Sequence, residues 1–140
     1  MSRTGRRLAF DYGDVRIGVA VCDADAILST PLEPLDSKNP ALLIMIKELV
    51  DEFEPVRIYV GDPLNLSGEP SESSAKARLF AEKLKVIASC EVLMIDERLT
   101  TVSATALLTQ AGISAKNQRR KIDSLSAVAI LESGLARDRR

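Results

Sequence analysis

Histidine and tryptophan are absent from this sequence of 140 residues, and only two cysteines are present. The absence of histidine excludes a serine hydrolase with a histidine base, and it argues against a zinc site. The two cysteines, Cys22 and Cys90, match no metal-binding spacing, and both lie in apolar, strand-like stretches. We therefore expect them to be reduced core residues and the protein to be cytoplasmic.

Long apolar runs are also missing. No stretch approaches the ~20 residues that a membrane helix needs, and Asp11 interrupts the apolar stretch that follows the basic N-terminus, which argues against a signal peptide. We expect no membrane partner. The length, the 46% hydrophobic content and the 28% charged content indicate one globular domain over residues 1–140. We expect a monomer or a homodimer, although the sequence does not determine the oligomeric state.

Charge is distributed unevenly, although the formal net charge is only -1. Residues 1–10 sum to +3 and residues 114–140 to +4, so the middle of the chain is acidic. This pattern fits phosphate-binding surfaces beside a carboxylate site. One candidate for such a surface is the basic group Arg119, Arg120 and Lys121. An ordinary solvated surface group is an equally good interpretation of these residues.

The spacing of apolar residues predicts an alternation of strands and helices. The expected strands cover residues 5–12, 15–22, 26–30, 56–60 and 91–95, with the third ending at Pro31. The expected helices begin near Asn39, Ser71, Thr100 and Ile122. This order predicts an α/β fold whose mixed sheet has three antiparallel strands, then two parallel strands, with helices on both faces.

Three acids stand where such a fold gathers its functional residues, at the carboxyl ends of parallel strands. Asp11 closes the first strand, Glu97 follows the fifth, and Asp123 begins the last helix. Three neighbouring carboxylates repel one another unless a divalent cation binds. Mg²⁺ or Mn²⁺ prefers such oxygen ligands, and two ions about 4 Å apart can promote phosphodiester hydrolysis.

Each acid also has an ordinary structural interpretation. Asp11 could pair with Arg16 across the hairpin, and Glu97 could pair with Arg98 at the surface. Asp123 could be an acid that the helix dipole favours at a helix start.

Four blocks of sequence resemble the YqgF/RuvX family of small bacterial proteins. They are Asp11-Tyr12-Gly13 with Arg16-Ile17-Gly18-Val19-Ala20, Val60-Gly61-Asp62-Pro63-Leu64-Asn65, Asp96-Glu97-Arg98-Leu99-Thr100-Thr101, and Lys121-Ile122-Asp123-Ser124-Leu125-Ser126-Ala127. The resemblance implies an RNase H-like fold and a nuclease of the pre-16S rRNA or Holliday-junction type.

The resemblance also implies roles for particular residues. Asp11, Glu97 and Asp123 would hold the metal ions and activate a water molecule against a phosphodiester. Four further residues match motif positions beside that site and are candidates for substrate binding: Arg16, Asn65, Arg98 and Thr100. Their alternatives are a counterion of Asp11 for Arg16, a turn residue for Asn65, and a helix cap for Thr100.

Some positions depart from the family pattern. Asp62 stands where an apolar residue is usual, and Ser124 and Ser126 replace small alanine-like positions. The loop over 67–74 is acidic, which would oppose nucleic acid beside the site.

Three function classes follow from these observations. The leading one is a metal-dependent nuclease acting on structured nucleic acid, with precursor 16S rRNA as the expected substrate and branched DNA as an alternative. With five Phe and Tyr residues in all, recognition through shape and phosphates is favoured over base stacking. A non-catalytic RNA-binding assembly factor is the second class. A nucleotide-binding fragment of the sugar-kinase type is the third, but it would need a second domain to enclose ATP.

Overall fold

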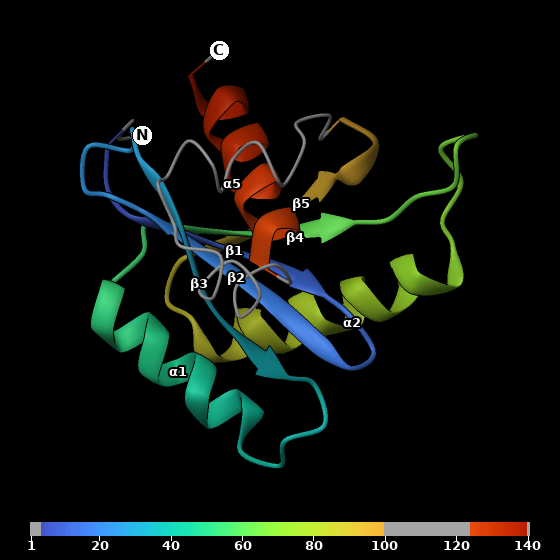
Figure 1. The fold of residues 1–140 in the computed structure, drawn as a ribbon, viewed down its shortest axis with the longest axis horizontal. Helices are drawn as coiled ribbons and strands as arrows, with labels where there is room; N and C mark the ends of the chain where they lie inside the picture. Colours follow the sequence, from blue (N-terminus) through green and yellow to red (C-terminus); the bar gives the residue numbers. More distant parts are fainter. Residues whose placement is uncertain (1–3, 100–123, 140) are drawn as a thin grey trace, which may run out of the picture.

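A computed structural model describes residues 4–99 and 124–139. Its sheet has five strands in the order β3-β2-β1-β4-β5 (Figure 1). The strands are β1 (Arg7–Tyr12), β2 (Arg16–Cys22), β3 (Ser29–Asp36), β4 (Arg57–Asp62) and β5 (Glu91–Asp96). Strand β2 is antiparallel to both β1 and β3, whereas β4 is parallel to both β1 and β5. The predicted mixed sheet is therefore confirmed.

Helices cover both faces of this sheet, as expected (Figure 1). Helices α1 (Leu42–Phe53) and α2 (Glu72–Ile87) cover one face, and α5 (Leu125–Asp138) crosses the other and contacts all five strands. A single 3₁₀ turn, η1 (Glu97–Leu99), follows β5. The helix expected to begin near Thr100 lies outside the described residues.

Successive side chains of β1 point to opposite faces of the sheet and belong to two separate layers of the core. Leu8 and Phe10 point into the layer under α1 and α2, whereas Ala9 points into the layer under α5. Side chains of a strand alternate between its two faces, so Asp11 belongs to the α5 side. Small residues on that side, including Ala20 of β2, leave room for α5 to lie close to the sheet.

The third strand departs from the prediction. We expected it over residues 26–30 with its end at Pro31, but β3 runs from Ser29 to Asp36 and includes Pro31 and Pro34. Proline cannot donate a backbone hydrogen bond, so it is tolerated in a strand at the edge of a sheet. Strand β3 is such an edge strand, which explains why the prolines do not end it.

The carboxyl end of α5 is held by a buried ionic cluster. The Asp138 carboxylate lies 2.7 Å from Arg57 Nη1 and 3.3 Å from Arg7 Nε, and it accepts a hydrogen bond from the hydroxyl of Tyr59. Gly134 lies against the Tyr59 ring, where a Cβ atom would come within 2.5 Å of the ring.

None of the helices in the described part of the chain has the length and apolar character that a membrane span requires.

Candidate active site

The sheet brings Asp11 and Glu97 together, although 85 residues separate them in the sequence. Asp11 is the next-to-last residue of β1 and Glu97 directly follows β5, and both strands run parallel to β4 between them. Their carboxyl groups are joined by a hydrogen bond. Two carboxyl groups can share a hydrogen bond only when one of them carries the proton.

Glu97 is the group that carries this proton. Burial raises the pKa of Glu97 to about 8, and the hydrogen bond and the negative charge of Asp11 contribute to the same effect. Asp62 and Asp96 add smaller contributions in the same direction. At neutral pH and without a cation, Glu97 is therefore mainly protonated and donates to Asp11.

Gly61 forms the floor beneath the Glu97 carboxyl group. It lies in β4, between the strands that carry the two acids. A Cβ atom at this position would lie 2.6 Å from Glu97 Oε1 and 2.4 Å from Ile130 Cδ1 of α5. Any side chain here would push Glu97 away from β4, so the site depends on glycine at position 61.

The arrangement fits a hard divalent cation. The two described acids offer only carboxylate oxygens, the ligands that Mg²⁺ and Mn²⁺ prefer. A cation would also offset the burial and the neighbouring negative charges that raise the pKa of Glu97. Within residues 4–99 and 124–139, no three acidic, cysteine or histidine side chains form a metal-binding group. Asp123, the third expected ligand, lies outside these residues.

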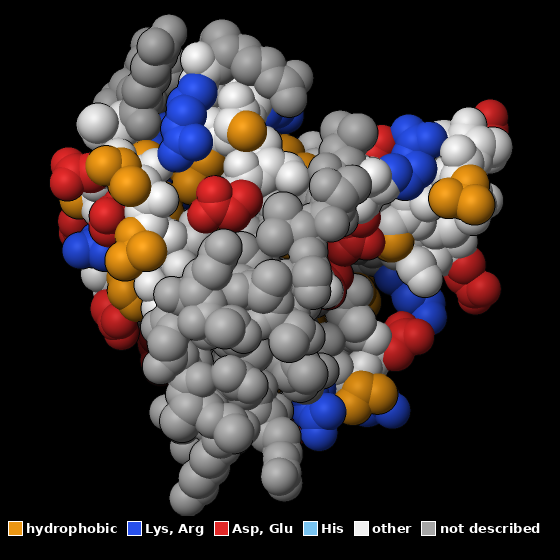
Figure 2. Space-filling view, turned by 45° about the horizontal axis from the view of Figure 1, so that its top comes forward, with side chains coloured by type: hydrophobic (Ala, Val, Ile, Leu, Met, Phe, Trp, Pro, Cys, Tyr) orange, Lys and Arg blue, Asp and Glu red, His pale blue; other side chains and the backbone are white. Residues whose placement is uncertain are grey.

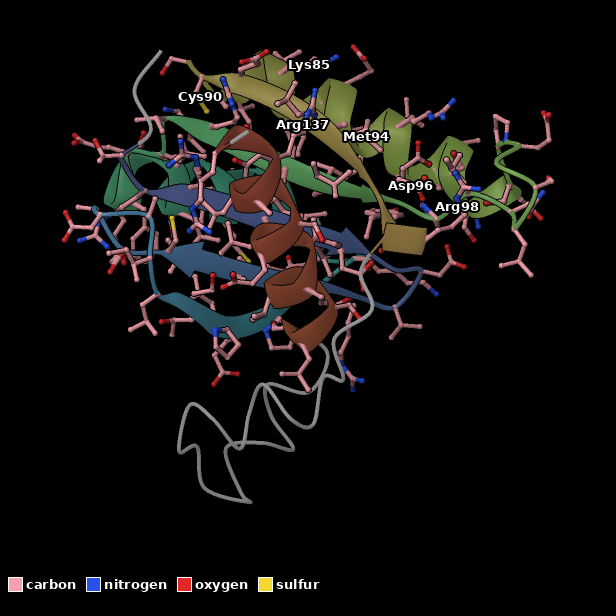
Figure 3. All side chains as sticks on the ribbon, turned by 90° about the horizontal axis from the view of Figure 1, so that it is seen from above. Lys85, Cys90, Met94, Asp96, Arg98 and Arg137 are labelled. Atoms are coloured by element: carbon pink, nitrogen blue, oxygen red, sulfur yellow. The ribbon has the colours of Figure 1, made fainter. Side chains whose placement is uncertain are left out.

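Arg98 pairs with Asp96, and Glu97 turns toward Asp11 instead. Arg98 Nε and Nη2 donate to the Asp96 carboxylate at 2.6 to 3.1 Å, and this ion pair lowers the pKa of Asp96. Figure 3 shows both residues at the carboxyl end of β5, far from Cys90. The alternative of a surface pair between Glu97 and Arg98 is therefore wrong.

Comparison with known proteins gives the family. The sequence model of the RuvX family, described as "Holliday junction resolvase", matches residues 5–137. The chain belongs to the RuvX family.

Relatives and solved structures agree with this assignment. A protein of Streptomyces avermitilis named "Putative pre-16S rRNA nuclease" is 45% identical over 139 residues, which cover 98% of this chain and 89% of that protein. A protein of Mycobacterium leprae with the same name is 46% identical over 133 residues, which cover 94% of this chain and 72% of that protein.

Among solved structures, Thermus thermophilus RuvC in complex with a Holliday junction substrate shares 18% identity, with a TM-score of 0.66 and 95% of each chain covered. At that identity the likeness shows a common RNase H-like fold, and the predicted fold class is confirmed. The names of family and relatives share one chemistry, hydrolysis of phosphodiester bonds in nucleic acid, so the expected enzyme class is confirmed as well.

Other candidate residues of this RuvX-family chain are less directly connected to the two acids. Arg16 is exposed at the start of β2, opposite Asp36 of β3 in the strand register. Asn65 is exposed in the loop after β4, where its backbone carbonyl accepts from the Gly68 N–H at 2.8 Å. Thr100 and the basic group Arg119, Arg120 and Lys121 lie outside the described residues.

The loop over 63–71 is tied to β5 through Arg98. Arg98 Nη1 donates to the Leu66 carbonyl at 3.2 Å, and its guanidinium lies over Gly68. Arg98 therefore links the end of β5 to the loop over 63–71.

Asp62 is accommodated through contacts that the sequence did not indicate. It is buried, accepts a hydrogen bond from the Ser74 hydroxyl at 2.5 Å and pairs with Arg78 Nη2 at 2.8 Å. Both partners belong to α2, on the opposite face of the sheet from Glu97. The only hint in the sequence was the departure from the family pattern at Asp62.

The outer surface of this RuvX-family chain carries both signs of charge. Figure 2 shows Lys and Arg side chains interspersed with Asp and Glu on the visible face, where the described residues form no continuous basic area. Phosphate contacts on this face would therefore come from separate cations.

Proposed function

We propose that this chain is a metal-dependent nuclease that hydrolyses phosphodiester bonds in precursor 16S rRNA, with residues 1–140 acting as a single nuclease domain. One observation carries the proposal: Asp11 and Glu97 meet at the end of the sheet and share a proton that a divalent cation could replace. The names of the relatives support the choice of substrate.

In this proposal, Asp11, Glu97 and Asp123 hold Mg²⁺ or Mn²⁺. When bound, such ions supply Lewis-acid chemistry, which activates water and stabilises charge on the phosphodiester. Gly61 keeps the Glu97 carboxyl group in place from below, and in the metal-free chain Asp11 orients it through their hydrogen bond. Glu97 must lose its proton before it can act as an anionic ligand, so activity should increase with pH toward the Glu97 pKa.

Substrate contacts are proposed for the cations around this edge. Arg98 holds the loop over 63–71 through the Leu66 carbonyl, and Arg16 stands at the start of β2. The basic group Arg119, Arg120 and Lys121 would add phosphate contacts, which predicts binding that weakens steeply with salt. Asn65 and Thr100 complete the proposed set.

The test is cleavage of labelled precursor 16S rRNA and of a four-way DNA junction by the purified protein with Mn²⁺ or Mg²⁺. We expect cleavage of the rRNA and its loss in Asp11→Asn and Glu97→Gln, each without a lower melting temperature. Glu91→Gln is the matched control, because this glutamate lies at the other end of β5 and pairs with Arg57. It should cleave like the wild type.

Other outcomes favour the other function classes. Cleavage of the junction alone would make this chain a DNA resolvase. Full biological activity of Glu97→Gln would favour a non-catalytic assembly factor. A metal-independent cleavage that survives both substitutions would contradict the proposal.

A further inference from the structure

Glu97 lies one residue beyond the part of the sheet that strand pairing holds in place. Strand β5 ends at Asp96, and its register with β4 ends at the pair Asp62 and Asp96. Glu97 begins the 3₁₀ turn η1, which is only three residues long. Short 3₁₀ segments have poorer hydrogen-bond geometry than α-helices. The direction of the Glu97 side chain therefore depends on what holds this turn.

The Asp96 side chain closes the turn around Glu97. Its Oδ1 atom accepts a hydrogen bond from the Arg98 backbone N–H at 2.9 Å, so the backbone of Glu97 lies inside the closed ring. Aspartate commonly stabilises a turn by accepting from a backbone N–H two residues later. The Arg98 guanidinium binds the same carboxylate through Nε and Nη2 at 2.6 to 3.1 Å. Asp96 thus holds residue 98 by both its main chain and its side chain.

Asp96 itself belongs to the face of the sheet opposite the two-carboxylate site. Its register partner Asp62 points toward α2, where it pairs with Arg78. Side chains of register partners in neighbouring strands point to the same face of a sheet. Asp96 therefore belongs to the α2 side, whereas Glu97 bonds to Asp11 on the α5 side. Asp96 can act on Glu97 through the turn, and it does not lie beside Glu97 as a second ligand.

We propose that Asp96 is a positioning residue for Glu97, because it closes the turn that directs the Glu97 carboxyl group toward Asp11. The inference rests on the proposed function, in which Glu97 is a metal ligand. Gly61 provides the space for the carboxyl group, and Asp96 fixes the backbone that places the group there. Without the bond to the Arg98 N–H, the backbone at Glu97 can adopt other conformations, and its carboxyl group is no longer held beside Asp11.

The decisive pair of variants is Asp96→Ala and Asp96→Asn. Alanine removes the acceptor for the Arg98 N–H, whereas asparagine keeps an acceptor oxygen and removes the negative charge. Mn²⁺ affinity is measured by calorimetry without nucleic acid, alongside the melting temperature and the kcat and KM of rRNA cleavage.

Asp96→Ala should weaken both metal binding and catalysis. Losing a residue that orients a metal ligand typically costs 10-fold or more in metal affinity or activity, so we expect about a tenfold higher Kd for Mn²⁺ and about a tenfold lower kcat. The KM for rRNA should change little, because the turn acts on the metal ligand and not on substrate binding. Asp96→Asn should return Kd and kcat to within about threefold of the wild-type values, since it keeps the turn closed.

Asp23→Ala is the matched control. The Asp23 carboxylate also holds a turn, because its Oδ1 atom accepts from the backbone N–H groups of Ile27 and Leu28 at 2.8 and 3.3 Å. This turn follows β2, which is antiparallel to β1, so it lies at the other end of the sheet from Asp11. Asp23→Ala should keep the wild-type Mn²⁺ affinity and kcat.

The outcomes decide the inference independently of catalysis. Wild-type Mn²⁺ affinity in Asp96→Ala would overturn it, whatever happens to kcat or the melting temperature. Equal losses of Mn²⁺ affinity in Asp96→Asn and Asp96→Ala would also overturn it, because the charge of Asp96 would then matter and not the turn. The same holds for an equal loss in Asp23→Ala, because any loosened turn would then suffice.

The wild-type protein separates this inference from the proposed function. If the wild type binds Mn²⁺ but cleaves neither substrate, the proposed function fails while the comparison of Mn²⁺ affinities still judges Asp96. If the wild type does not bind Mn²⁺, both proposals fail.

Discussion

Substitution of Gly61 by alanine is the sharpest perturbation of the two-carboxylate site. The new Cβ atom would lie 2.6 Å from Glu97 Oε1, 3.0 Å from Glu97 Cδ and 2.4 Å from Ile130 Cδ1. Ordinary carbon–oxygen contacts begin at about 3.3 Å. Ile130 can turn its terminal methyl group aside, but the Glu97 carboxyl group must retreat from β4 by about 0.7 Å to reach that contact distance.

The size of the effect follows from this displacement. Overpacking of a core typically costs about 1–3 kcal/mol, which corresponds to a melting temperature lower by about 3–10 °C for a domain of this size. A catalytic group misplaced by about 1 Å can lose about 100-fold in rate. We therefore expect Gly61→Ala to keep its fold and to lose about 100-fold in kcat.

The assay is Mn²⁺-dependent cleavage of labelled precursor 16S rRNA, at a temperature where each variant is folded. Gly134→Ala is the matched control: its new Cβ atom would come within 2.5 Å of the Tyr59 ring but does not touch the acids. It should lower the melting temperature and keep kcat near the wild-type value. If Gly61→Ala cleaves within threefold of the wild type at the same Mn²⁺ concentration, the inferred dependence on the position of Glu97 is refuted.

Two further predictions concern the acids and the loop. Because the pKa of Glu97 is raised from 4.5 to about 8 in the folded chain, the metal-free protein should lose stability as pH rises from about 4.5 to 8. Mg²⁺ should restore that stability at pH 8. In thermal unfolding, Asp11→Asn should lose less stability between pH 4.5 and 8 than the wild type does. An equal loss of stability in both proteins would contradict the proton shared by Asp11 and Glu97. Arg98→Ala should speed amide hydrogen exchange in residues 64–69 about tenfold, because the loop loses its bond from Arg98 to Leu66, while global stability changes by less than about 1 kcal/mol. An unchanged rate of amide hydrogen exchange would mean that contacts other than the bond from Arg98 order the loop.

Strand periodicity and the order of elements were readable from the sequence. Alternating and apolar runs predicted four of the five strands near their true bounds, and the crossover helices required the later strands to be parallel. From this alone, Asp11 and Glu97 could be expected at one edge of the sheet, and the hydrogen bond between them bears this out. The third strand was the exception, because the sequence does not say that it lies at an edge where proline is tolerated.

Partner choice was decided by the tertiary structure. Sequence adjacency left open that Arg98 pairs with Glu97, but in the 3₁₀ turn after β5 Arg98 pairs with Asp96 and Glu97 turns to Asp11. Gly61 under Glu97 and Ser124 between β2 and β3 are contacts across 36 and 105 residues, which no local pattern encodes. Local propensity and period determine which segments form strands and helices, whereas pKa values, ion pairs and close approaches depend on distances that exist only once those segments pack.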